Sequence, residues 1–330
     1  MNAAPIVEAL DLVRHFALPR VGLRRSDRRV RAVDGVSFSI HQGETFGLVG
    51  ESGCGKTTLS RLLLGLDAPT SGRLHVAGHD ITSLRGPQEK AYRRDVQAVF
   101  QDPYGSLNPR HRVQRIVGEP LALHEGLRGA ALRRRVCDLL RMVGLPEEAV
   151  DQYPHEFSGG MRQRLAIARA ISIHPRLIVL DEPVSALDVS IRAQVLNLLR
   201  DLQKELALTY VFIAHDLAVV EYMSDRVGVM YLGRLVEVAT ADQLYRQPRH
   251  PYTRALIRAA SLTERSAGDD GVSLDGDVPS PIDPPSGCRF RTRCPHVAER
   301  CAKEEPRLDR VDDGHVVACH FHRQIAAADS

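Results

Sequence analysis

The chain has 330 residues, with 44 Lys and Arg against 41 Asp and Glu, a net charge of +3 and 43% hydrophobic residues. This length allows one large and one small domain, and the composition excludes a largely disordered chain. The charge balance does not indicate a nucleic-acid partner, and no apolar run reaches the roughly 18 to 20 residues of a membrane span. Acidic residues appear by Glu8 without a basic region before an apolar stretch, so we expect no secretory signal and a cytoplasmic protein.

The predicted elements alternate between strands and helices. Two strand patterns, 33–40 and 45–50, are followed by an expected helix over 56–65 and by a long helical region over 85–172. Four prolines are expected to break that region, namely Pro103, Pro109, Pro120 and Pro154. Next come an apolar strand at 177–182, an amphipathic helix with Ile191, Val195, Leu198, Leu199 and Leu202, an apolar strand at 210–215, a strand pair at 226–239 and a helix after His250. This alternation predicts an α/β protein with a parallel sheet covered on both faces.

Composition also divides the chain. Residues 1–261 read as one main domain, with a helical subdomain at about 95–172. Residues 262–287 are acidic and rich in Gly and Pro, which predicts a linker. Residues 288–330 hold four of the six cysteines and form a separate Cys-rich segment.

A phosphate-binding pattern lies between the second strand and the first helix. It fits G-x-x-x-x-G-K-[ST] and consists of Gly50, Glu51, Ser52, Gly53, Cys54, Gly55, Lys56 and Thr57, continued by Thr58. Its glycines let backbone N–H groups point at phosphate oxygens, and the following helix adds the positive end of its dipole. We expect Lys56 to reach the β- and γ-phosphates of ATP and Thr57 to hold Mg²⁺ through its hydroxyl.

The apolar strand at 177–182 supplies acidic groups. Asp181 lies at its carboxyl end, where a carboxylate can hold Mg²⁺, and Glu182 follows as a candidate base for the attacking water. An acidic pair after a strand is a weak signal alone, but with the phosphate-binding loop it predicts ATP hydrolysis.

A third motif carries a family resemblance. Ser158, Gly159, Gly160 and Gln163 open a predicted helix, and with the two motifs above they resemble the signature of the ATP-binding subunits of ABC transporters. The resemblance covers nearly the whole chain and implies a P-loop NTPase ABC ATPase core. It also implies that the signature completes the ATP site of a partner subunit, so that two subunits sandwich two ATP molecules.

The resemblance implies further site residues. Gln101 is similar to the Q-loop glutamine, with a catalytic and Mg²⁺-binding role, His215 to the catalytic switch histidine, and Asp188 to the D-loop aspartate. Phe16 occupies the place of the aromatic that stacks on adenine, although a basic insertion over 19–31 interrupts the match. A core phenylalanine is the alternative for Phe16.

The sequence around the motifs resembles that of the dipeptide/oligopeptide (and nickel) importer branch. The sequences GESGCGKTT, VFQDPYGSLNPR and HPYTRAL carry this likeness, together with the cysteine-rich ending. It implies an ATPase that powers peptide import, pairs with a second ATPase subunit as a heterodimer, and works under two membrane permeases at the cytoplasmic face. An extracytoplasmic substrate-binding protein would be an indirect partner.

Two other functions compete with this one. A non-transport ABC ATPase acting on ribosomes or DNA is one, but this chain has one cassette and no sustained heptads. An ATPase that mainly senses a metal or redox state is the other, suggested by the cysteines near the C-terminus.

These cysteines are Cys288, Cys294, Cys301 and Cys319, spaced C-x5-C-x6-C-x17-C. A reducing cytosol disfavours disulfides, and structural zinc usually uses shorter spacings. We therefore predict a structural [4Fe–4S] cluster, which takes four thiolates. The alternatives are free thiols, a zinc site that also uses His315 or His320, and a redox-labile pair. The resemblance implies the same cluster.

Overall fold

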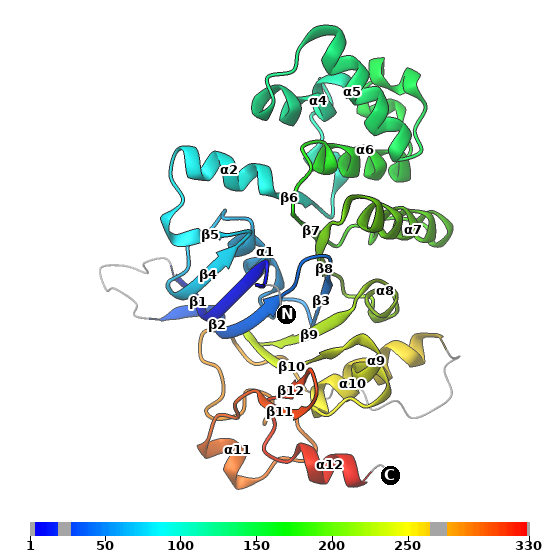
Figure 1. The fold of residues 1–330 in the computed structure, drawn as a ribbon. Coiled ribbons are helices and arrows are strands. Elements are labelled where there is room, and N and C mark those ends of the chain that lie inside the picture. Colours follow the sequence, from blue (N-terminus) through cyan, green and yellow to red (C-terminus); the bar gives the residue numbers. More distant parts are fainter. Residues whose placement is uncertain (1–3, 19–27, 265–275, 329–330) are drawn as a thin grey trace.

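The computed structural model describes residues 4–18, 28–264 and 276–328. It contains a sheet with strand order β2-β1-β4-β5 and a larger sheet with order β11-β12-β10-β9-β3-β8-β7-β6 (Figure 1). The strands are β1 (Val7–Ala17), β2 (Arg29–Ile40), β3 (Thr45–Val49), β4 (Ser71–Val76), β5 (His79–Asp80), β6 (Val96–Val99), β7 (Leu177–Asp181), β8 (Thr209–Ile213), β9 (Arg226–Tyr231), β10 (Arg234–Thr240), β11 (Asp309–Asp312) and β12 (His315–Val317).

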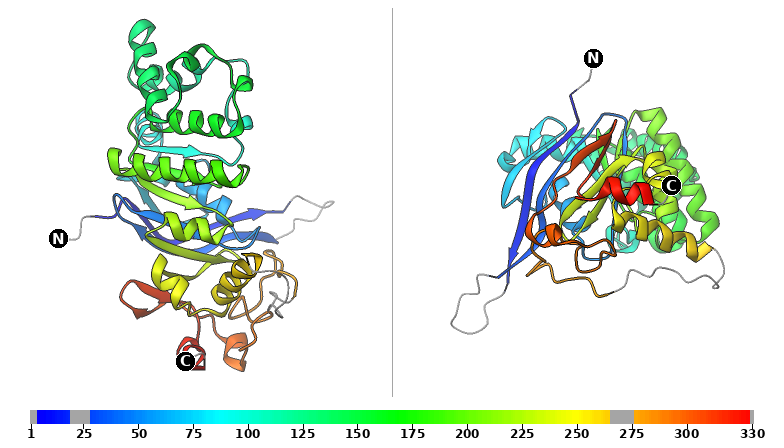
Figure 2. Two further views of the ribbon diagram at one scale, coloured as in Figure 1. Left: turned by 90° about the vertical axis from the view of Figure 1, so that its right-hand side faces the viewer. Right: turned by 90° about the horizontal axis from the view of Figure 1, so that it is seen from below.

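Helices surround the larger sheet and form a separate group at one end of the molecule (Figures 1 and 2). They are α1 (Lys56–Leu63), α2 (Pro87–Asp95), α3 (Pro103–Ser106), α4 (Val113–His124), α5 (Gly129–Met142), α6 (Gly159–Ile171), α7 (Val189–Leu206), α8 (Leu217–Met223), α9 (Ala241–Arg246), α10 (Pro251–Glu264), α11 (Glu299–Lys303) and α12 (His322–Ala328). Among the described residues, no helix is long and apolar enough to cross a membrane.

The centre of the larger sheet is parallel, as the alternation of strands and helices predicts. Strand β3 pairs in parallel with β8 and β9, and β7 pairs in parallel with β6 and β8. All residues of β3 and β8 are buried, because helices or the other sheet cover both faces. The α/β prediction is confirmed for this core. The separate β2-β1-β4-β5 sheet is antiparallel, and the sequence analysis assigned only part of it.

Pro120 lies inside α4, so the prediction that it breaks the helical region is wrong at this position. Proline there removes one backbone hydrogen bond. The buried face of α4 includes Val113, Ile116, Val117 and Leu121, which belong to the same core cluster as residues of α5 and α6. This packing stabilises α4 despite the backbone hydrogen bond that Pro120 cannot donate.

The C-terminal segment is not a detached module. Strand β12 pairs antiparallel with β10 at the edge of the larger sheet. The fully buried Glu237 of β10 accepts a hydrogen bond from Nε2 of His315 in β12, at 2.8 Å, and from the backbone N–H groups of Arg249 and His250. A buried carboxylate needs such partners, and these partners fasten the segment to the sheet. The segment lies at the end opposite α4–α6 (Figures 1 and 2).

Candidate functional site

The loop between β3 and α1 requires glycine at two positions. Gly50 has φ 150° and Gly55 has φ 114°, both in the region that favours glycine. A Cβ at Gly55 would lie 2.1 Å from the backbone oxygen of Ala32, and one at Gly50 would lie 2.2 Å from the backbone oxygen of Met230. Backbone atoms cannot move aside easily, so the spacing of the glycines matches the close packing of this loop against neighbouring strands.

A cavity of about 470 Å³ opens beside this loop. The residues around it come from the loop and α1, from the ends of β7 and β8, from β1 and β2, and from the segment before the cysteines. They are Phe16, Val30, Ala32, Ser52, Gly53, Gly55, Lys56, Thr57, Thr58, Asp181, Glu182, Ile213, His215 and Pro281. The structure thus brings the predicted phosphate-binding, acidic and histidine residues to one cavity.

Lys56 is held at the floor of the loop. Its side chain is largely buried, and Nζ donates to the backbone oxygens of Gly50, at 2.6 Å, and Glu51, at 3.0 Å. The loop carbonyls satisfy the ammonium while leaving it within the cavity lining. A buried cation at the N-terminus of α1 favours an anionic ligand such as phosphate.

Asp181 and Thr57 supply oxygen groups suited to a hard cation. Burial is the main cause that raises the pKa of Asp181, and the charge of Glu182 adds to it; the Ser60 hydroxyl and Lys56 act in the opposite direction. A carboxylate penalised in this way gains most from a bound cation. Together with the Thr57 hydroxyl on the same cavity, these groups fit the oxygen-rich coordination of Mg²⁺.

Glu182 and His215 face each other at the cavity wall. Oε2 of Glu182 lies 3.4 Å from Nδ1 of His215, and the His215 side chain is 64% exposed. Glu182 adopts φ 49°, and its backbone N–H donates to the oxygen of Ile213 at 2.8 Å. A left-handed conformation is uncommon for glutamate, and such strain is often found at functional sites. This pair can take a proton from a water molecule in the cavity.

Phe16 is half-buried and lines the same cavity. It does not belong to the buried core, which argues against the alternative of a core phenylalanine. The guanidinium of Arg14 lies 4.5 Å from its ring centroid, on one face. Of the insertion over 19–31, residues 19–27 lie outside the described residues, and residues 29–31 form the start of β2.

The other predicted residues are not brought to this cavity. Gly50, Glu51 and Cys54 belong to the loop but do not line the cavity, and Cys54 is buried with its thiol pKa raised, mainly by desolvation. Gln101 is exposed in the turn after β6. The signature residues Ser158, Gly159, Gly160 and Gln163 lie at the start of α6, and Asp188 lies before α7.

The N-terminus of α6 is nevertheless capped and tightly packed. The Ser158 hydroxyl accepts a hydrogen bond from the N–H of Met161 at 3.4 Å, as expected of an N-cap residue. A Cβ at Gly160 would lie 2.4 Å from Cγ2 of Ile191 in α7, and Gln163 is buried. These glycines leave the first N–H groups of α6 accessible to a ligand from outside the chain.

Sequence analysis missed part of the cavity. Pro281, placed in the predicted linker, lines it together with Val30 and Ala32, and the Pro281 oxygen accepts a hydrogen bond from the N–H of Arg31 at 3.0 Å. The linker residues 276–287 therefore include part of the site, while 265–275 lie outside the described residues. No motif marks Pro281, because only its position in the fold brings it near the loop.

The structure does not support the predicted iron–sulfur cluster. In the described residues, no group of three or more His, Cys, Asp or Glu side chains is arranged to hold a metal ion, which applies equally to the zinc alternative. All four cysteines are free. Burial, followed by the charges of neighbouring cysteines, raises the pKa of Cys288 to about 12 and that of Cys319 to about 11. The neighbouring thiols thus affect one another's pKa, but in the part of the chain that the structure describes they do not form a group arranged to hold a metal ion.

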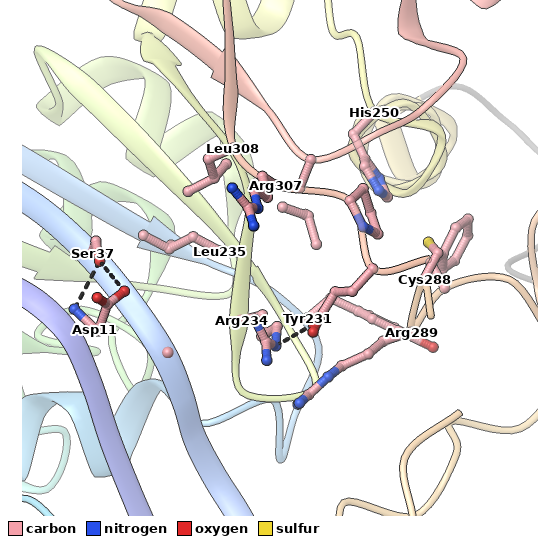
Figure 3. A pocket seen from close by; sticks show the side chains of 16 residues that line it. Asp11, Ser37, Tyr231, Arg234, Leu235, His250, Cys288, Arg289, Arg307 and Leu308 are labelled. Atoms are coloured by element: carbon pink, nitrogen blue, oxygen red, sulfur yellow. Dashed lines mark hydrogen bonds and ion pairs between the residues drawn. The ribbon is translucent and has the colours of Figure 1, made fainter. Parts of the chain in front are cut away.

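A second, larger hollow of about 680 Å³ lies between the C-terminal segment and strands β9 and β10 (Figure 3). Cys288 and Arg289 enter it from the C-terminal segment, whereas Arg234 and Leu235 enter it from β10. None of the residues predicted to bind ATP or Mg²⁺ lines it.

Comparison with protein families matches two regions. Residues 33–185 match the family described as "ABC transporter", and residues 236–301 match "Oligopeptide/dipeptide transporter, C-terminal region". The first region contains the loop, the signature and the Asp181–Glu182 pair, and the second contains three of the four C-terminal cysteines.

Whole-chain relatives share close to half of the residues. A putative oligopeptide transport ATP-binding protein of Bacillus subtilis is 48% identical over 98% of this chain and 97% of its own length. The dipeptide transport ATP-binding protein DppF of Escherichia coli is 48% identical over 96% and 94%, and a putative peptide import ATP-binding protein of Brucella ovis is 48% identical over 97% and 98%.

Solved structures share the fold. The dimeric structure of MJ0796, a bacterial ABC transporter cassette, has a TM-score of 0.62 at 28% identity and covers 71% of this chain and 98% of its own. A dimeric post-hydrolysis state of the same cassette, bound to ADP and Pi, has a TM-score of 0.61.

Proposed function

Because the chain belongs to the ABC transporter family of ATP-binding proteins, in its oligopeptide/dipeptide branch, we propose that it hydrolyses ATP to power peptide import. The observation that carries this proposal is the single cavity that collects Lys56, Thr57, Asp181, Glu182 and His215. The relatives that span the whole chain support the peptide as the transported class. A ribosome- or DNA-acting ATPase has no comparable support.

We assign a part in hydrolysis to several of the residues around the cavity. Lys56 and the loop N–H groups bind the phosphates, and Mg²⁺, when bound near Thr57 and Asp181, neutralises part of their charge. Glu182 accepts the proton of the attacking water, and His215, 3.4 Å away, holds the Glu182 carboxylate and the water in place. Phe16, which lines the same cavity, stacks on the base.

We infer that the complete site needs a second subunit. The signature residues of α6 lie outside the cavity of their own chain, so Ser158, Gly159, Gly160 and Gln163 would contact ATP held by a partner, and Asp188 would lie at the same interface. The dimeric state of the solved relatives supports this arrangement. We propose a heterodimer with a second ABC ATPase, with Gln101 joining the Mg²⁺ site once the dimer closes.

The proposal extends to the membrane partners. Two permease subunits would receive this chain at the cytoplasmic face of the membrane, and an extracytoplasmic binding protein would deliver the peptide to them. The full transporter tests this directly. Uptake of a labelled dipeptide, by cells that lack the gene, should return with the wild-type chain and not with Glu182→Gln. Uptake restored equally by both chains would contradict the proposal.

The [4Fe–4S] cluster, with zinc as the alternative, stays a separate proposal that carries no step of the mechanism. The nearness of the four free thiols supports it, and the missing ligand arrangement opposes it. Anaerobic purification followed by iron and acid-labile sulfide analysis decides between them. About four irons and four sulfides per chain would support the cluster, and zinc alone would support the alternative. A protein that contains neither iron nor zinc would contradict both.

A further inference from the structure

A bidentate ion pair joins the C-terminal segment to the phosphate-binding loop. Nη1 and Nη2 of Arg293 lie 2.8 Å and 3.0 Å from the two carboxylate oxygens of Glu51. The Arg293 side chain is 3% exposed and that of Glu51 is 22% exposed. Two parallel, charge-assisted hydrogen bonds in a mostly buried setting fix both position and orientation, unlike an exposed ion pair.

Glu51 is held at its backbone as well. Its N–H donates to the hydroxyl of Tyr252 in α10 at 2.9 Å, and its carbonyl accepts from Nζ of Lys56 at 3.0 Å. The guanidinium of Arg293 also faces the ring of Tyr231, with 5.9 Å to the centroid. Glu51 is therefore the loop residue at which the C-terminal segment, α10 and the phosphate-binding lysine meet.

Arg293 compensates the negative charge of Glu51. A carboxylate in a loop that binds a triphosphate repels the ligand, and this repulsion is strong in a partly buried site. Arg293 neutralises that charge and draws the side chain toward the C-terminal segment, so that Glu51 does not line the cavity.

A second arginine of the same segment contacts the turn that packs against the phosphate-binding loop. Arg289, which is buried, donates to the backbone oxygen of Leu232 and to Asp34. Leu232 precedes Gly233 in the turn between β9 and β10, and the Gly233 N–H donates to the Cys54 oxygen at 2.8 Å. Figure 3 shows Arg289 reaching past Tyr231 toward this turn.

We propose that Arg293 is a positioning residue for ATP binding, which acts by neutralising and holding Glu51. The C-terminal segment then belongs to the nucleotide site, in addition to closing the sheet. This inference rests on the proposed function, because it concerns the same ATP site.

The test measures the Kd of Mg·ATP for the full-length chain by isothermal titration calorimetry. Arg293→Gln leaves the Glu51 carboxylate uncompensated and should raise Kd at least about 10-fold, since losing one partner of a buried pair leaves the other charge unpaired beside the bound phosphates. The double variant Glu51→Gln/Arg293→Gln removes both charges and should recover most of the affinity. Arg300→Gln, which breaks an exposed pair with Glu304 on the same segment, is the matched control and should bind like the wild type.

Urea unfolding of each variant separates positioning from general stability. A purely structural arginine would lower the free energy of unfolding in Arg293→Gln but leave the Kd of the folded protein for Mg·ATP unchanged. If Arg293→Gln does not fold, Arg293→Lys keeps the charge but not the two parallel bonds, and it should show a smaller loss of affinity. Wild-type affinity in folded Arg293→Gln or Arg293→Lys, or a double variant as weak as Arg293→Gln, would overturn the inference. A wild-type chain that binds no ATP would instead contradict the proposed function.

Discussion

Phe16 should contribute to ATP affinity and little to stability. The ring is half-buried in the lining of the cavity that also contains the phosphate-binding loop, with Arg14 on one face. Stacking of a base on an aromatic side chain contributes about 1–3 kcal/mol. Phe16→Ala should therefore weaken ATP binding by roughly 5- to 150-fold.

The cost to folding should be smaller. Full burial of a phenylalanine stabilises a protein by about 1.5–3 kcal/mol, and this ring is only half-buried, so the free energy of unfolding should fall by about 1 kcal/mol. Leu10→Ala is a matched control, because Leu10 lies on the same strand, is 38% exposed and does not line the cavity.

Calorimetry with Mg·ATP and with inorganic triphosphate separates the base from the phosphates. Phe16→Ala should lose affinity for ATP but bind triphosphate like the wild type, whereas Leu10→Ala should change neither. Urea unfolding supplies the stability of each variant. A Phe16→Ala protein that is destabilised yet keeps its ATP affinity would refute the stacking role.

Three further predictions use other features of the site and the fold. Lys56→Ala should lose ATP binding itself in calorimetry, because it removes the positive charge that binds the phosphates; unchanged binding would contradict the role of Lys56. Gly55→Ala should lower the free energy of unfolding in urea by at least about 2 kcal/mol, since its Cβ would lie 2.1 Å from a backbone oxygen. Gly53→Ala, whose Cβ would meet open space, is the control and should lower the free energy of unfolding by about 1 kcal/mol. Equal losses in the two variants would argue against this packing. Burial lowers the pKa of His250 to about 4, so its neutral form contributes stability above pH 6.5 that falls as the pH drops from 6.5 toward 4. Urea unfolding at pH 7.5 and 5 should show a steeper loss for the wild type than for His250→Asn, by up to about 2 kcal/mol, and equal losses would refute it.

Local patterns predicted the elements that carry the chemistry. The loop around Lys56 and the acidic pair after β7 are sequence-adjacent motifs, and their position between a strand and a helix follows from hydrophobic periodicity. The pairing of Glu182 with His215 depends on β7 and β8 being parallel neighbours. The alternation of strands and helices predicted a parallel sheet but not which strands are adjacent.

Long-range contacts could not be predicted in the same way. The approach of Pro281 to the cavity and the pairing of Arg293 with Glu51 join residues more than 200 positions apart, and neither has a local signature. The Cys-rich segment was predicted to hold a metal because of the number and spacing of its cysteines. In the structure its strands extend the larger sheet, and the buried Glu237–His315 pair fastens it there. Burial against the main domain supplies the core that the segment alone lacks.

The most direct test of ATP hydrolysis at this cavity is phosphate release from Mg·ATP by the purified chain and by Glu182→Gln, with ATP binding measured beside it. The wild type should release phosphate, whereas Glu182→Gln should bind ATP with similar affinity but release almost none, since the substitution removes the proton acceptor and keeps the shape. Phosphate release by Glu182→Gln at the wild-type rate would contradict the assignment of this cavity as the hydrolytic site.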